Sequence, residues 1–191
     1  MDCTLDLSLH KKKSVYAAGN YRGVHLTAQL SKAMERLLQE LFMPFLYKTI
    51  AYGPNQFAYS PERGARDVIA HLVLEWLCAL SKNLKVAVYC SDVSGAFDRV
   101  RLERLVNKLR RKGIHPQIVA VLASWLQQRC GQVVVGGEAS KIMNMVYQGT
   151  VWGPSLWNVF FGDAWKAVRD AGFLEVVFAD DLNAFKEAGL A

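Results

Sequence analysis

Two acidic sites in this chain stand at the ends of apolar runs that are typical of β-strands. Asp92 follows the apolar residues 86–90, and the adjacent Asp180 and Asp181 interrupt the apolar stretch 175–185. A carboxylate at the rim of a buried strand is costly unless a cation meets it, and a divalent metal ion is one such cation. Each site also has a simpler explanation, in which Asp92 caps a following helix and the Asp pair forms an ordinary turn.

The two sites become informative together. Residues 175–185 have the outline of a β-hairpin with Asp180 and Asp181 at its tip. If that tip lies against Asp92, three carboxylates share one place and need cations to hold them. A two-metal site uses such a set, because Mg²⁺ prefers hard oxygen ligands and a metal pair clamps the attacking and leaving oxygens of a phosphoryl transfer.

A third block lies between the acidic sites. Gln148 and Gly149 precede a Gly153–Pro154 step and an apolar segment that continues to residue 161. Glycine permits close approach of a backbone to a ligand, and proline suits the first position of a helix. Taken alone, the block is equally a loop that enters a helix without any ligand.

The elements expected to position these residues follow from hydrophobic spacing. We expect the strand at 86–90 to be buried on both faces, because it is continuously apolar. The helix expected at 27–41 has Thr27 as its N-cap, and its apolar stripe is interpreted as core: Leu30, Met34, Leu37, Leu38 and Leu41. Further helices are expected at 67–80, 99–112, 117–128 and 152–170, and strands at 132–135 and 142–147.

In this order the three blocks resemble the reverse transcriptases of non-LTR retrotransposons, of the LINE and jockey-like type. The blocks read Asp-x-x-x-Ala-Phe-Asp at 92–98, Gln-Gly-x-x-x-Gly-Pro at 148–154 and Phe-Ala-Asp-Asp at 178–181. Residues 20–38, with Tyr-Arg and Lys-x-x-Glu-Arg, resemble the fingers segment of that family. The resemblance extends from about residue 20 to residue 185.

The resemblance implies an RNA-directed DNA polymerase that adds dNTPs to a primer 3′-hydroxyl by two-metal phosphoryl transfer. It makes Asp92, Asp180 and Asp181 the catalytic carboxylates and the ligands of Mg²⁺ or Mn²⁺. The partners it implies are an RNA template with a DNA or RNA primer, and dNTPs. The alternative is an inactive, truncated retroelement remnant that binds RNA without catalysis, and a palm-type nucleotidyl cyclase ranks below both.

The resemblance also assigns residues around the nucleotide. They are Arg22 and Arg63 near the triphosphate, Phe97 as a steric gate against a ribose 2′-hydroxyl, and Gln148 and Gly149 in the pocket. Arg66 is an alternative to Arg63, because Ser60 stands where the family has its first Arg. Phe97 is equally interpreted as a core residue. The residues expected to contact nucleic acid are Arg66, Arg99, Arg101 and Lys108.

The implied fold class is α+β, the right-hand polymerase fold. We expect a fingers-like segment at 1–84 and a palm with a small antiparallel sheet at 85–191, together one partial domain without its thumb. The family has Pro where Gly23 and Tyr147 stand here.

Composition agrees with a nucleic-acid partner. The chain has 191 residues, 52% of them hydrophobic, and a formal net charge of +6, which favours a polyanion. Its four cysteines lack metal-ligand spacing, which argues against a zinc module and a disulfide framework and favours an intracellular location, in cytoplasm or nucleus. The sequence predicts no signal peptide, no transmembrane segment and no membrane partner.

Overall fold

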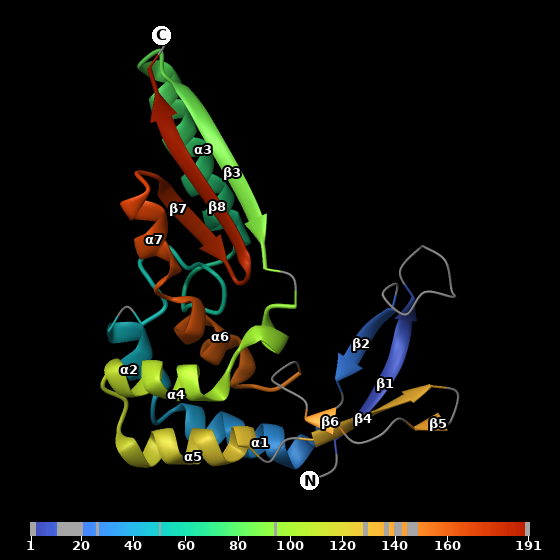
Figure 1. Ribbon diagram of the computed structural model, residues 1–191. Helices are drawn as coiled ribbons and strands as arrows, with labels where there is room; N and C mark the ends of the chain where they lie inside the picture. Colours follow the sequence, from blue (N-terminus) through green and yellow to red (C-terminus); the bar gives the residue numbers. More distant parts are fainter. Residues whose placement is uncertain are drawn as a thin grey trace.

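A computed structural model describes residues 3–10, 21–25, 27–49, 51–93, 95–127, 130–135, 138–139, 143–144 and 149–189 (Figure 1). The helices are α1 (Gln29–Gln39), α2 (Met43–Lys48), α3 (Ala65–Ser81), α4 (Leu102–Arg111), α5 (Pro116–Gln127), α6 (Gly153–Phe161) and α7 (Ala164–Asp170), with a 3₁₀ turn at Phe97–Arg99. The strands are β1 (Cys3–His10), β2 (Tyr21–His25), β3 (Lys85–Asp92), β4 (Cys130–Val135), β5 (Glu138–Ala139), β6 (Met143–Asn144), β7 (Leu174–Phe178) and β8 (Asp181–Ala188). The chain is therefore mixed α+β, as expected.

The three-stranded antiparallel sheet carries the acidic motifs. Its strand order is β3-β8-β7, so the hairpin strand β8 lies in the middle. Strands β7 and β8 are joined by the two residues Ala179 and Asp180. The parallel bridge between Gln56 and Val177 extends the sheet at the β7 edge. The predicted hairpin at 175–185 is confirmed.

Helix α3 packs against one face of this sheet. Its Val68 forms a buried cluster with Val176 of β7 and Phe185 of β8. Strand β3 lies at the open edge of the described sheet, and its Val88 and Tyr89 are 43% and 61% exposed. The prediction that residues 86–90 are buried on both faces is wrong, because a continuous apolar run does not reveal which strand occupies an edge.

A second sheet joins the beginning of the chain to its middle. Its strand order is β2-β1-β4-β5, with β6 also paired to β4. Strand β1 is antiparallel to β2 and parallel to β4. Strands from both predicted segments, 1–84 and 85–191, therefore share this sheet, and the boundary between them stays a prediction.

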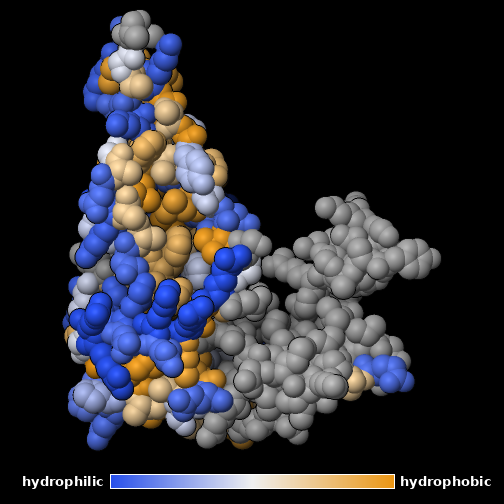
Figure 2. All heavy atoms as spheres, viewed as in Figure 1, coloured by the Kyte–Doolittle hydropathy of each residue, from blue (hydrophilic) through white to orange (hydrophobic). Residues whose placement is uncertain are grey.

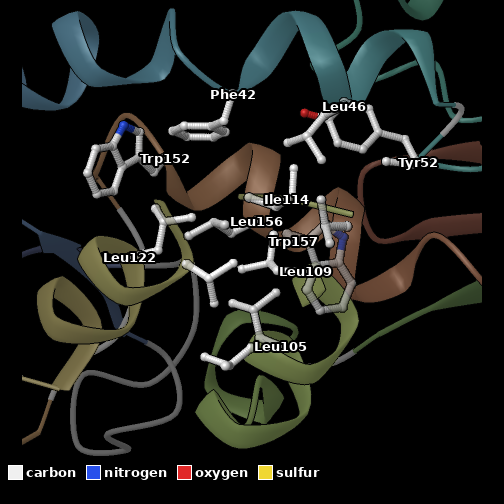
Figure 3. Close-up of a cluster of buried hydrophobic side chains, with 14 of the residues drawn as sticks. Phe42, Leu46, Tyr52, Leu105, Leu109, Ile114, Leu122, Trp152, Leu156 and Trp157 are labelled. Atoms are coloured by element: carbon white, nitrogen blue, oxygen red, sulfur yellow. The ribbon is translucent and has the colours of Figure 1, made fainter. Parts of the chain in front are cut away.

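The largest hydrophobic core lies among helices rather than beneath the acidic sheet (Figure 3). Helix α4 contributes Leu105 and Leu109, α5 contributes Leu122 and α6 contributes Leu156, and all four side chains have no exposed surface. Phe42 packs edge-on against Trp152 at 5.9 Å between ring centroids. This core holds α6, which begins just after the Gln-Gly block, against the two helices that follow Asp92.

Helix α1 lies against this core with an unexpected face. Its fully buried residue is Glu35, whereas most of the predicted core stripe is exposed: Leu30 68%, Met34 50%, Leu37 68% and Leu41 65%. Only Leu38 of that stripe packs against the core. The N-cap is Ala28 rather than Thr27. Both predictions are wrong, because periodicity identifies an apolar stripe without identifying what covers it.

The helix predicted at 152–170 is two helices. Gly162 follows α6, and the carbonyls of Ala51 and Asn158 lie where a side chain on Gly162 would be. The predicted helix at 67–80 is present as α3, although its Leu77 and Leu80 are more than half exposed.

The visible surface has distinct apolar and hydrophilic regions. Figure 2 shows apolar side chains gathered along the upper part of the molecule, at the level of α3 and β3, above a hydrophilic band at the level of α4. Among the helices in the described part of the chain, none combines the length and hydropathy needed to cross a bilayer.

Candidate active site

The backbone register brings the two acidic motifs together. Asp92, the last residue of β3, is directly opposite Asp181, the first residue of β8. Side chains of directly opposed residues lie on one face, with Cβ atoms about 4.5–5.5 Å apart. Asp180 precedes Asp181 in the turn. Asp92 therefore ends a strand, and the alternative in which it caps the next helix is excluded, because the 3₁₀ turn has Ala96 and α4 has Arg101 as N-cap.

The three carboxylates interact electrostatically. Partial burial, and then the negative charges of Asp180 and Asp92, raise the pKa of Asp181 above its ordinary value. Like charges disfavour ionisation of a neighbour. The site is therefore one that a cation stabilises.

The side chains of Gln56 and Trp157 form hydrogen bonds with the backbone of the hairpin tip. Ala179 has a left-handed backbone, with φ of 58°, which is uncommon for a residue with a Cβ. Its amide donates to Oε1 of Gln56 at 3.0 Å, and its carbonyl accepts from Gln56 Nε2 at 3.2 Å and Trp157 Nε1 at 2.9 Å. Gln56 and Trp157 are 3% exposed. These contacts define the position of Asp180 and Asp181.

Sequence reasoning missed this support. The sequence patterns single out neither Gln56 nor Trp157. The signal that could have found Gln56 is its chemistry, because an amide can both donate to and accept from one backbone residue. Its distance from the hairpin in sequence concealed the contact.

A pocket of about 440 Å³ opens beside the carboxylates. Asp92 and Asp181 line it together with Cys90, Asn183 and the first turn of α3. Its wall is part apolar and part polar, and Phe178 contributes an aromatic ring. The carboxylates thus border a cavity large enough to admit part of a ligand.

Phe97 begins the 3₁₀ turn that lies between β3 and α4 in the sequence. Its side chain is half-buried and packs against the main core, with its ring 5.9 Å from that of Trp157. The contact with Trp157 therefore supports the interpretation of Phe97 as a core residue. Its role as a steric gate stays a prediction.

Arg63 supports the loop that leads to Gln56. Its Nη1 donates to the carbonyl of Pro54 at 2.9 Å, and its guanidinium lies 5.2 Å from the Phe57 ring centroid. It lines a second pocket, of about 480 Å³, that Asp92 and Asp181 do not line. Arg66 is exposed in the first turn of α3, next to Ala65 of the carboxylate pocket.

The predicted nucleotide pocket is only partly described. Gln148 lies outside the described residues, and Arg22 is described as backbone in β2, with its position opposite Leu9 of β1. Gly149 has φ of 76°, in the region that favours glycine. Its carbonyl accepts a hydrogen bond from Oγ1 of Thr27 at 2.9 Å.

The predicted nucleic-acid residues differ in their surroundings. Arg99 and Arg101 are exposed at the entry to α4. Lys108 forms an ion pair with Asp163 at 2.6 Å and donates to the carbonyl of Phe160. Its charge is therefore already matched within the chain.

Among the residues that the structure describes, the carboxylates do not form a complete metal-ligand cluster. Within the parts of the chain that the structure describes, no group of three or more His, Cys, Asp or Glu side chains has the geometry to hold a metal ion. The donor set itself fits a divalent cation, because opposed Asp carboxylates supply the oxygen ligands that Mg²⁺ and Mn²⁺ take.

Comparisons with a family model and with known protein sequences give matches over most of the chain. The family model described as reverse transcriptase (RNA-dependent DNA polymerase) matches residues 9–188. An RNA-directed DNA polymerase from mobile element jockey of Drosophila melanogaster is 32% identical over 162 residues, which is 82% of this chain and 18% of that protein. A probable RNA-directed DNA polymerase from transposon BS of the same species is 28% identical over 193 residues, covering 92% of this chain and 20% of that protein. The chain thus spans about a fifth of the length of these relatives.

A solved structure shares the fold. Apo telomerase from Candida tropicalis, truncated from its C-terminal domain, superposes with a TM-score of 0.59 at 13% identity and covers 97% of this chain and 43% of that one. At this identity the likeness supports the architecture alone.

Proposed function

Since this chain belongs to the reverse transcriptase family, we propose that it carries the nucleotidyl-transfer centre of an RNA-directed DNA polymerase. The proposed reaction joins a dNTP to a primer 3′-hydroxyl on an RNA template. The observation that supports it most is the register that sets Asp92 opposite Asp181, with Asp180 in the adjoining turn.

Enzymes of this family use divalent metal ions, and we assign Mg²⁺ or Mn²⁺ to Asp92, Asp180 and Asp181. When bound, such ions activate the attacking hydroxyl and neutralise charge on the transferring phosphate. The chain's part is to hold the three carboxylates in place and to keep them ionised beside a cation. The raised pKa of Asp181 means that its ionised form is disfavoured until a cation offsets the neighbouring negative charges.

Substrate binding is proposed for residues around this centre. Gln148 and Gly149 line the nucleotide pocket, Phe97 excludes a ribose 2′-hydroxyl, and Arg22 with Arg63 contacts the triphosphate. Arg66 is the better-placed alternative to Arg63, because it adjoins the carboxylate pocket whereas Arg63 lines the other one. The proposed partners are an RNA template with a primer, contacted by Arg66, Arg99 and Arg101. Lys108, which the sequence placed with them, is paired with Asp163 instead.

A second candidate is a remnant that binds RNA without turnover. One observation favours it: no described group of three acidic, His or Cys side chains has metal-binding geometry. Such a remnant keeps the net charge of +6 and binds RNA in a manner that does not depend on Asp92.

The test is incorporation of dTTP on a poly(rA)·oligo(dT) template with Mg²⁺. Asp180→Asn is compared with wild type, and Asp170→Asn, at the exposed end of α7, is the matched control. We expect incorporation by wild type and by the control and at least a hundredfold loss in Asp180→Asn, in line with the size of electrostatic contributions to catalysis. A folded wild-type chain without incorporation contradicts the proposal and supports the remnant.

A further inference from the structure

Glu35 is a fully buried carboxylate in a helix whose apolar stripe is exposed. It lies on α1 and is 1% exposed, whereas Met34 and Leu37 beside it are at least half exposed. Burying a charged group is costly unless hydrogen bonds compensate for the lost hydration. The packing of α1 is therefore arranged around a polar side chain, which calls for an explanation.

The contacts of Glu35 reach two other helices. Its Oε1 accepts a hydrogen bond from Nε1 of Trp125, on α5, at 3.1 Å, and one from Ser31 at 3.2 Å. Its Oε2 accepts from the backbone amide of Val151 at 2.6 Å and, more weakly, from that of Trp152 at 3.4 Å. Trp152 also donates its Nε1–H to the backbone carbonyl of Glu35 at 2.6 Å.

These amides belong to the segment that leads from Gly149 into α6. Trp152 is the N-cap of helix α6, and its side chain does not form a capping hydrogen bond with the helix. A negative charge is favourable at a helix N-terminus, where backbone amides lack partners. Glu35 supplies that charge from a different helix. Thr27, just before α1, holds the other end of the segment through the Gly149 carbonyl.

We infer that Glu35 is a positioning residue that fixes the segment 149–152, and with it Gly149, in the place needed for nucleotide binding. The inference rests on the proposed function, because it takes Gly149 as part of the nucleotide pocket. Thr27 assists at the Gly149 end. Helix α1 thereby couples the beginning of the chain to that pocket, and this role explains why it buries a carboxylate.

Amide hydrogen exchange tests whether Glu35 and Thr27 hold the segment 149–152, and this test does not require enzymatic activity. We compare wild type with Glu35→Ala, Glu35→Gln and the matched control Glu40→Gln, at the exposed C-cap of the same helix. Exchange in the segment 149–153 is expected to accelerate about tenfold or more in Glu35→Ala, because bonds to a charged acceptor are lost. Glu35→Gln accelerates it less, since its amide retains only one acceptor oxygen. Glu40→Gln leaves it unchanged.

A second pair of variants addresses the other end. Thr27→Val removes the hydroxyl that Gly149 accepts from and is expected to accelerate exchange near Gly149, whereas Thr27→Ser retains it and restores protection. Exchange in the β7–β8 hairpin serves as the reference for folding and stays as in wild type. Unchanged exchange in 149–153 in a folded Glu35→Ala chain overturns the inference.

Kinetics separate positioning from a merely structural role. In Glu35→Gln the KM for dTTP is expected to rise at least fivefold while affinity for the template–primer is unchanged. Faster exchange with an unaltered KM overturns the positioning role. Failure of the proposed function is seen independently, as absence of incorporation by wild type, and the exchange arm still decides whether Glu35 holds the segment.

Discussion

The ionised side chains of Asp92, Asp180 and Asp181 repel one another at one end of a sheet. Burial and the two neighbouring charges raise the pKa of Asp181, so the folded chain binds this proton more tightly than the unfolded chain does. The ionised carboxylate therefore destabilises the fold at neutral pH, and this cost disappears as the pH falls through the raised pKa. Residues that suit a metal site thus weaken the metal-free fold.

Asp181→Asn is expected to stabilise the metal-free chain. The gain at pH 7 is on the order of 0.2–1 kcal/mol, the size of cross-strand pair energies, or up to about 2–4 °C in Tm. The gain shrinks as the pH falls through the raised pKa of Asp181, because the wild-type carboxylate then becomes protonated as well. Thermal unfolding in EDTA across a pH series measures it, and a lower Tm for the variant at pH 7 would contradict the charge repulsion.

Gln56 is expected to be essential for the hairpin tip. Gln56→Leu leaves the amides of Ala58 and Ala179 without the Oε1 acceptor that they share, at a cost of about 1–3 kcal/mol. Gln127→Leu, at the exposed end of α5, is the matched control and changes little. Urea unfolding distinguishes the two variants. Equal stability of both would show that the hydrogen bonds of Gln56 do not contribute to the free energy of unfolding.

At the scale of elements, the junction of α6 and α7 depends on the absence of a side chain. A Cβ on Gly162 would meet the carbonyls of Ala51 and Asn158, whereas one on Gly189 would meet nothing within 4 Å. Backbone atoms cannot move aside as a flexible side chain can. The junction between α6 and α7 therefore packs closely against the backbone of residues 51–52, which precede Gln56.

Gly162→Ala is expected to lower the free energy of unfolding by about 1–3 kcal/mol, the usual cost of overpacking. Gly189→Ala, the control, stays within about 0.5 kcal/mol of wild type. Chemical denaturation of both variants makes the comparison. Similar midpoints would mean that the 51–52 backbone relaxes freely away from α6.

Sequence patterns predicted those elements whose signal is local. The hairpin at 175–185 and the strand end at Asp92 depend on neighbouring residues and were found. The hydrogen bonds of Gln56 to the hairpin tip and the burial of Glu35 depend on residues more than 100 positions away. The periodicity of a sequence cannot show that such distant residues are in contact. The exposed face of α1 was misassigned for the same reason, because an apolar stripe has the same spacing whether or not another element covers it.

At the scale of the whole molecule, the net charge of +6 favours a polyanion, but its cations are not equivalent. Arg101 is exposed at the start of α4, whereas Lys108 is paired with Asp163. Neutralising a cation that contacts phosphate reduces the salt dependence of binding by about 0.7 in slope for a single strand. The two residues are therefore expected to behave differently.

Arg101→Gln is expected to lower the slope of log affinity for single-stranded RNA against log salt by about 0.7. Lys108→Gln leaves that slope nearly unchanged and instead lowers stability, since Asp163 loses its partner. Fluorescence anisotropy across a salt series measures both. An equal loss of slope in the two variants would mean that Lys108 leaves Asp163 to bind RNA.

The acidic end of the sheet, formed by Asp92, Asp180 and Asp181, is proposed to bind a divalent cation as a unit. Electron paramagnetic resonance of Mn²⁺ measures this directly, because free and bound ions give different signals and no turnover is needed. We expect wild type and Asp170→Asn to bind Mn²⁺ equally, and Asp92→Asn to bind it at least tenfold more weakly. Binding by Asp92→Asn that equals the wild type would contradict the claim.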